Sequence, residues 1–119
     1  MTELDLSEAT LAERMALLGV ADLALAGATP AHSGDVRRTC IEHVAALEGD
    51  VVGRPSEADV MRALNRLAAA GVVEEVPAGD ASPVGKGRPE YDLRDAPESV
   101  LSALAEDDRL APLAERVEG

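Results

Sequence analysis

Arg62 and Asn65 are the side chains in this sequence whose types and spacing best fit recognition chemistry. They are three residues apart, so they share a face if the stretch is helical. An arginine fits the O6 and N7 acceptors of guanine with two hydrogen bonds, and an asparagine fits N6 and N7 of adenine. Each such pair contributes roughly 1–3 kcal/mol of discrimination against a wrong base. The chemistry that these side chains would support is base reading in duplex DNA.

The surrounding pattern predicts the helix that would present them. Ser56 stands at the N-cap position, and Asp59 follows three residues later, as in a capping box. Gly71 fits the end of the helix, because glycine adopts the left-handed conformation at little cost. An apolar stripe at helical spacing predicts the buried face. It consists of Val60, Leu64 and Leu67.

Other polar positions are candidates for DNA contact. Ala58 could touch a thymine methyl group, and Lys86 and Arg88 at a glycine-rich tip suit phosphates or a narrow minor groove. Arginines outside the helix could set register on phosphates. For Arg66 and Arg38, an ordinary solvated surface role has about equal weight. The candidates are Arg37, Arg54, Ser56, Glu57, Ala58, Met61, Arg62, Asn65, Arg66, Lys86, Gly87 and Arg88.

Acidic residues at the start of the same helix argue against contact with phosphates. Glu57 and Asp59 most often interact with the helix dipole. Glu57 could instead accept a hydrogen bond from cytosine N4. A further hypothesis is an inorganic cation held between one of these carboxylates and a DNA phosphate.

The sequence contains no recognisable catalytic group or metal-ligand spacing. Cys40 lies on a predicted buried stripe, so a packed thiol is favoured over a redox sensor. His32 and His43 have no second cysteine with which to form a metal set, and both are interpreted as structural or surface residues. We therefore expect no enzyme activity, no cofactor and no metal.

Composition predicts one domain of 119 residues without a membrane span or signal peptide, hence a cytoplasmic protein. Aromatic residues make up only 1% of the chain, so the core must be built from Ala, Val and Leu. The formal charge of −12 argues against nucleic acid. However, ten arginines, a single lysine and dispersed acids are typical of proteins from salt-accumulating halophiles. At 1 M salt the Debye length is about 3 Å, so the global field is short-ranged.

The charge is uneven along the chain. Residues 37–94 contain eight basic and ten acidic residues, whereas the remainder contains three basic and thirteen acidic residues. The stretch with the recognition helix is therefore close to neutral on a very acidic protein.

Two helices and a small sheet are predicted around the recognition helix. Ser7 is the expected cap of a first helix to about Ala26, and Ser33 that of a second to about Leu47. The buried side of the first is predicted to be Leu11, Met15, Leu18 and Leu25. The stripe of the second is Val36, Cys40, Val44 and Leu47. A valine-rich strand from Val72 and a returning strand with Tyr91 would form a hairpin, joined by a very short strand before the second helix.

The chain after residue 95 predicts a last helical segment, with Pro97 in its first turn and Pro112 as the point of a kink or restart. Its apolar residues need a surface, for which a two-fold dimer is favoured over folding back on the first helix. The predicted dimer residues are Leu11, Val100, Leu101, Leu104, Leu110, Leu113 and Val117.

The segments Ser56–Glu75 and Gly85–Leu93 resemble winged-helix transcription regulators, most closely the PadR-like group. They share a polar cap, an ALxRL core at 63–67, a glycine at 71 and a GR-rich wing with an aromatic residue at its end. The resemblance implies a mainly α fold with a β-hairpin wing (α+β), with winged helix-turn-helix at 1–95 and a C-terminal dimerisation helix at 96–119. It also implies a dimer with the helix in the major groove and the wing on the backbone or in the minor groove.

The expected function is a sequence-specific, homodimeric DNA-binding regulator of halophilic archaeal type, acting on a pseudo-palindromic site under high salt, with a role in a stress response. The alternative is a winged-helix protein-interaction module in a larger complex. The expected partners are double-stranded DNA, a second copy of the chain and inorganic cations at the DNA interface, without a membrane.

Overall fold

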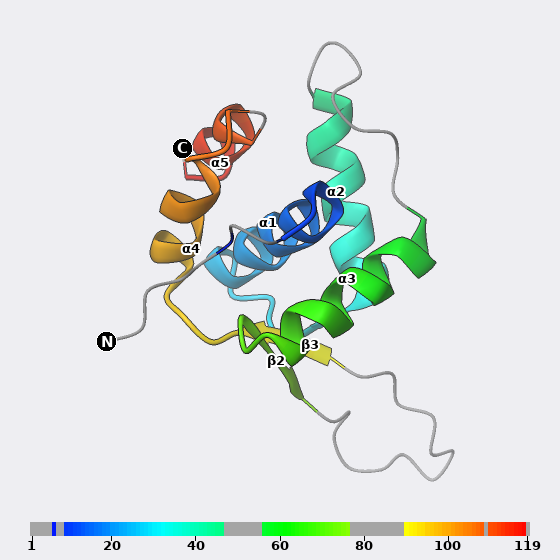
Figure 1. Cartoon of the computed structure of the whole chain (residues 1–119). Helices are drawn as coiled ribbons and strands as arrows, with labels where there is room; N and C mark the ends of the chain where they lie inside the picture. The colour runs from blue at the N-terminus through cyan, green and yellow to red at the C-terminus, as the bar shows by residue number, and fades with distance from the viewer. Residues whose placement is uncertain (1–5, 7–8, 47–55, 77–89, 109, 119) are drawn as a thin grey trace, which may run out of the picture.

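A central helix, α1 (Leu11–Leu25), lies among the other elements of the fold (Figure 1). The computed structural model describes residues 6, 9–46, 56–76, 90–108 and 110–118. The Thr10 hydroxyl accepts a hydrogen bond from the backbone N–H of Glu13, and the Glu13 carboxylate accepts one from the N–H of Thr10. This capping box starts the helix at Leu11, so the expected cap at Ser7 is wrong.

The middle of α1 is buried on all sides. Every residue from Met15 to Ala21 is buried, and the helix contacts α2, α3, α4, α5 and β3. A helix that is apolar all round belongs in a core. Met15 and Leu18 are buried as expected, but Leu25, which was predicted to be buried, is 41% exposed. Leu25 is the last residue of α1, where the surrounding elements cover its side chain only in part.

Four further helices surround α1 in the described part of the chain. Figure 1 shows α2 and α3 on one side of α1, and α4 and α5 on the other. Pro97 opens α4 at its first position, and Pro112 lies in the first turn of α5, so the predicted restart is confirmed. The bounds are α2 (Ser33–Ala46), α3 (Glu57–Ala69), α4 (Pro97–Leu104) and α5 (Ala111–Glu118).

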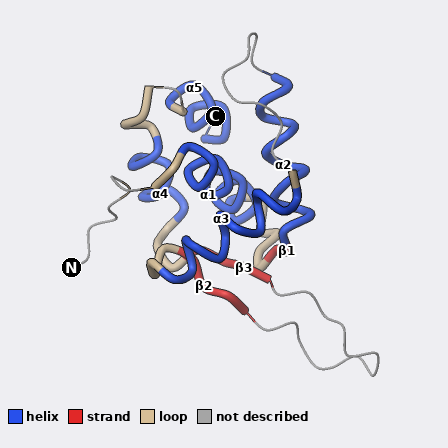
Figure 2. The backbone as a smooth tube through the Cα atoms, turned by 45° about the vertical axis from the view of Figure 1, so that its right-hand side comes forward, coloured by secondary structure: helices blue, strands red, loops and turns tan. Residues whose placement is uncertain are grey.

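A small antiparallel sheet closes one end of the molecule (Figure 2). Its strands are β1 (Ala31–His32), β2 (Val73–Val76) and β3 (Glu90–Leu93), in the order β1-β3-β2. The predicted hairpin strands and the short strand before α2 are therefore confirmed. Tyr91 is only 2% exposed, whereas the other residues of β3 are half-buried.

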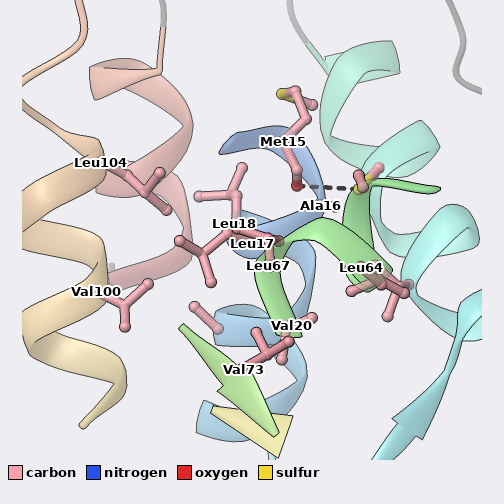
Figure 3. Packing of buried hydrophobic residues seen from close by; sticks show 14 of the residues in the cluster. Met15, Ala16, Leu17, Leu18, Val20, Leu64, Leu67, Val73, Val100 and Leu104 are labelled. Atoms are coloured by element: carbon pink, nitrogen blue, oxygen red, sulfur yellow. Dashed lines mark hydrogen bonds between the residues drawn. The ribbon is translucent and has the colours of Figure 1, made fainter. Parts of the chain in front are cut away.

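At Gly19, helix α1 packs directly against α2. A Cβ atom on this glycine would lie 3.0 Å from Cys40 Sγ and 3.2 Å from the carbonyl oxygen of Val36. The Cys40 thiol is fully buried and donates a hydrogen bond to Met15 O, which the dashed line in Figure 3 marks. Burial raises the pKa of this thiol to about 12, so it is a packed core thiol at neutral pH.

The C-terminal leucines pack inside the chain itself. Leu104 of α4 joins side chains of α1 and α3, such as Leu18 and Leu67, in one apolar cluster (Figure 3). Burying each leucine side chain stabilises the fold by about 1.5–3 kcal/mol. Five of the predicted dimer residues are 0–1% exposed in the single chain: Val100, Leu101, Leu104, Leu110 and Leu113.

This packing is the alternative in which the segment folds back on the first helix. Leu11 and Val117, the other two predicted dimer residues, are half-buried against the same cluster. A dimer through the five buried side chains would have to open the core, because they have almost no exposed surface. Dimerisation itself stays a prediction, and it needs other residues.

Ion pairs connect α1 both to the C-terminal segment and to α2. Arg14 of α1 forms an ion pair of 2.7 Å with Asp107 in the turn between α4 and α5, and its guanidinium also donates to Leu6 O. His43 of α2 lies 2.7 Å from a carboxylate oxygen of Asp22 on α1.

Among the helices that the structure describes, none combines the length and hydrophobicity needed to cross a bilayer.

Candidate nucleic-acid interface

Helix α3 has one face in the core and one face in solvent. Val60, Leu64 and Leu67 are at most 3% exposed, which confirms the predicted apolar stripe. The opposite face carries exposed residues that were predicted to contact DNA. They are Ala58, Met61, Arg62 and Asn65, with Arg66 beside them.

The start of α3 is fixed by a capping box. The Ser56 hydroxyl accepts a hydrogen bond from Asp59 N, and the Asp59 carboxylate accepts one from Ser56 N, over 3.0 and 3.2 Å. These bonds to Ser56, with a smaller effect of Arg62, lower the pKa of Asp59 below its usual value. Asp59 therefore stabilises the helix terminus in its ionised form, and the predicted capping box is confirmed. Gly71, with φ of +79°, follows the other end of the helix as predicted.

The two arginines of α3 contact acidic side chains but stay accessible. Arg62 lies 2.6 Å from Asp59, and Arg66 lies 3.7 Å from Glu13 at the start of α1. The arginine side chains are 71% and 73% exposed. Ion pairs at such exposure are weak, so either guanidinium can exchange its carboxylate for another anion at little cost.

A shallow hollow of about 370 Å³ lies beside these arginines, between the first turn of α1 and the flank of α3. Both arginines line it, together with Asp59 and Glu13, so it contains charges of both signs. Its mixed charge does not single out one class of ligand.

Asn65 has a partner that the sequence did not indicate. The hydroxyl of Tyr91 on β3 donates to Asn65 Oδ1 over 3.1 Å. Tyr91 was predicted only as a strand residue of the wing. Strand alternation puts it on the inward face, but its contact with a residue 26 positions earlier depends on how α3 packs.

Glu57 also interacts across helices. The hydroxyl of Ser33, the first residue of α2, lies 3.4 Å from Glu57 Oε2. Its carboxylate thus lies near the N-terminal end of α2, where the helix dipole favours negative charge. This position links α2 to α3, and base contact by Glu57 stays a prediction.

The remaining predicted phosphate contacts divide into two groups. Arg38 of α2 is exposed and forms an ion pair with Asp35 over 2.7 Å, and Arg37 beside it is half-buried and also has a partner. The others lie outside the described residues: Arg54, Lys86, Gly87 and Arg88.

No group of three or more potential metal ligands occurs among the residues that the structure describes. His32 lies 3.3 Å from Asp35 on the surface, and His43 is buried beside Asp22. Among the described residues, each histidine therefore forms an ion pair with one acidic residue. The arrangement on α3 offers hydrogen-bond donors on a convex helical surface, which suits the recognition of an anionic or polar groove.

Comparisons with protein-family models, with curated proteins and with solved structures found no match for this chain.

Proposed function

We propose that this protein is a sequence-specific DNA-binding transcription regulator with a winged helix-turn-helix fold. The observation that carries the proposal is the outward face of α3, where Arg62 and Asn65 stand exposed opposite a fully buried apolar stripe. Arg62 would read guanine, and Asn65 would read adenine or another base with a major-groove acceptor.

The order of elements supports the fold assignment. Helices α2 and α3 contact each other, α3 leads directly into β2, and β2 pairs with β3 in an antiparallel hairpin. In a winged helix-turn-helix, α3 would be the recognition helix and this hairpin the wing. Helices α4 and α5 would then be an addition that covers the side of α1 away from α3.

The proposed regulator acts as a homodimer on a pseudo-palindromic site. Two copies related by a two-fold axis would place their α3 helices in successive major grooves, with half-site centres about 34–36 Å or a multiple apart. The acidic composition fits a halophilic, archaeal protein that binds DNA at high salt. Because counterion release weakens phosphate contacts there, base contacts would carry more of the affinity. A stress response is the proposed physiological setting.

The proposal is tested by selecting genomic DNA fragments with purified protein in molar potassium chloride and sequencing them. We expect enrichment of one two-fold symmetric motif, whose half-site spacing reports the geometry of the dimer. A folded protein that enriches no motif would overturn the proposal.

Substitution of Arg62 links the motif to α3. We expect Arg62→Ala to reduce affinity for the selected sequence roughly 5- to 150-fold, because about 1–3 kcal/mol of base contact is lost. Arg116→Ala is the matched control, since it removes the same charge from an exposed position on α5. Equal effects of the two substitutions would mean that only net charge matters.

A protein-interaction module is the second candidate, favoured by the outer face of the sheet. Glu74 on β2 stands directly opposite Asp92 on β3, and like charges in this position repel. No described basic residue forms an ion pair with either carboxylate. A basic protein partner would relieve this repulsion, so retrieval of such a partner without DNA enrichment would favour this candidate.

A further inference from the structure

The hydrogen bond between Tyr91 and Asn65 connects the core to the proposed reading face. Tyr91 is 2% exposed, so its ring is held by the packing around β3. Asn65 is exposed on α3, yet its Oδ1 accepts the Tyr91 hydroxyl proton over 3.1 Å. A rigid core residue therefore determines how a surface amide is oriented.

The orientation has a chemical consequence. A carboxamide is planar, with its acceptor oxygen and its donor nitrogen on different sides. When Oδ1 faces Tyr91, Nδ2 with its two N–H donors faces away from the core. In the major groove, the acceptors available to these N–H donors are N7 of adenine, N7 and O6 of guanine, and O4 of thymine. Cytosine presents only a donor there, its N4 amino group.

We infer that Tyr91 is a positioning residue for base reading, holding the Asn65 amide so that Nδ2 points outward and selects a base with a major-groove acceptor. The inference rests on the proposed DNA-binding function and deepens it. Adenine is the best fit, because the second lone pair of Oδ1 can still accept from adenine N6.

The surroundings of Tyr91 keep the hydroxyl in its donor form. Burial, followed by the nearby negative charge of Glu75, raises the pKa of Tyr91 above its usual value. Glu75 stands opposite Tyr91 in the register of β2 and β3. Because this pKa lies above the ordinary value of 10.0, the hydroxyl keeps its proton at neutral pH and can donate to Asn65 Oδ1.

The chain makes this pair easy to test, because Tyr91 is its one aromatic residue and Asn65 its one carboxamide, with no glutamine in the sequence. In a ¹H–¹⁵N spectrum, Asn65 alone gives a side-chain NH₂ signal. We expect Tyr91→Phe to shift this signal while the backbone spectrum remains that of a folded protein. An unchanged NH₂ signal would overturn the hydrogen bond and with it the inference.

The DNA selection is then repeated with variants. Asn65→Ala identifies the base pair that Asn65 reads. Tyr91→Phe should reduce the preference at that base pair roughly tenfold while leaving intact the positions that Arg62→Ala alters. Asn65→Asp keeps an acceptor for Tyr91 but replaces the outward donor, so it should shift the preference towards cytosine or adenine, which offer a donor.

The outcomes separate this inference from the proposed function. If the wild-type protein selects no motif, DNA binding itself is overturned, and the inference falls with it. If the wild-type protein selects a motif and folded Tyr91→Phe selects the same motif with the same preference, the inference alone is wrong. A uniform loss of affinity at all positions would assign Tyr91 a purely structural role and also overturn it.

Discussion

Asp59, at the N-terminal end of α3, has two roles that use different oxygens of its carboxylate. Asp59 caps the helix and also forms an ion pair with Arg62. Approach of a DNA phosphate or base would draw Arg62 away from the carboxylate, but the capping bonds to Ser56 do not depend on that pair. The helix start can therefore stay intact while the arginine changes its partner.

Asp59 should make stability depend on pH. Because Ser56 and Arg62 hold its pKa below the ordinary value of 3.8, ionised Asp59 stabilises the fold above that pH, and this contribution is lost as the pH falls through the lowered pKa. Asp59→Asn should lower the free energy of unfolding at pH 7 but not at a pH below the lowered pKa. Urea denaturation at both pH values measures this difference.

The control for that experiment is Asp108→Asn, which makes the same charge change at an exposed position outside α3. It should leave the difference between the two pH values almost as in the wild type. If both variants behave alike, the effect comes from net charge and not from the cap.

Cys40 should be inert in the folded protein. Its thiol is buried and has a pKa of about 12, so the reactive thiolate is scarce at neutral pH. A thiol reagent at pH 8 should modify it only after the protein unfolds in urea. Rapid modification of the native protein would instead support the redox-sensor alternative.

At the scale of elements, close packing of α1 against α2 depends on the absence of one side chain. Gly19 faces α2, with Cys40 and Val36 as its neighbours. Helix propensity alone would favour alanine at this position by about 1 kcal/mol. The short distances to Cys40 and Val36 predict instead that alanine at this position lowers the stability of the protein.

Gly19→Ala should therefore destabilise the protein by about 1–3 kcal/mol, because the added methyl group forces the helices apart. Denaturant unfolding measures the change. Cys40→Ala in the same background should recover part of the loss, since the sulfur is the nearest atom at 3.0 Å. A more stable Gly19→Ala variant would show that the helices can separate freely.

At the scale of the whole molecule, helices α4 and α5 belong to the same apolar core as α1 and α3. The ion pair between Arg14 and Asp107 spans 93 positions and joins α1 to the turn between α4 and α5. The C-terminal segment is thus part of the unit that positions α3. Removal of the C-terminal segment should therefore destabilise the entire fold.

Leu104→Ala should lower the free energy of unfolding by about 2–5 kcal/mol in one cooperative transition. The loss should be the same at different protein concentrations, because Leu104 is buried within one chain. Leu25→Ala, at a position that is 41% exposed, should cost less than about 1 kcal/mol. If Leu104→Ala abolishes self-association with little loss of stability, the leucine would belong to a dimer interface.

The sequence by itself determined the features that depend on neighbours along the chain. The capping box at Ser56, the glycine after α3, the apolar stripe and the hairpin strands follow from spacing and backbone preference, so they were predictable. The outward position of Arg62 and Asn65 followed from the same periodicity.

Tertiary structure decided which distant residues meet. In the sequence, an apolar stripe that packs on α1 looks the same as one that packs on a second copy of the chain. Only the packed fold shows that Leu101 and Leu113 are buried within one chain. The same holds for Tyr91 and Asn65, because periodicity fixes which face a side chain is on but not which side chain lies opposite it. The burial of the middle of α1 also depends on tertiary structure, because elements from the rest of the chain cover it on every side.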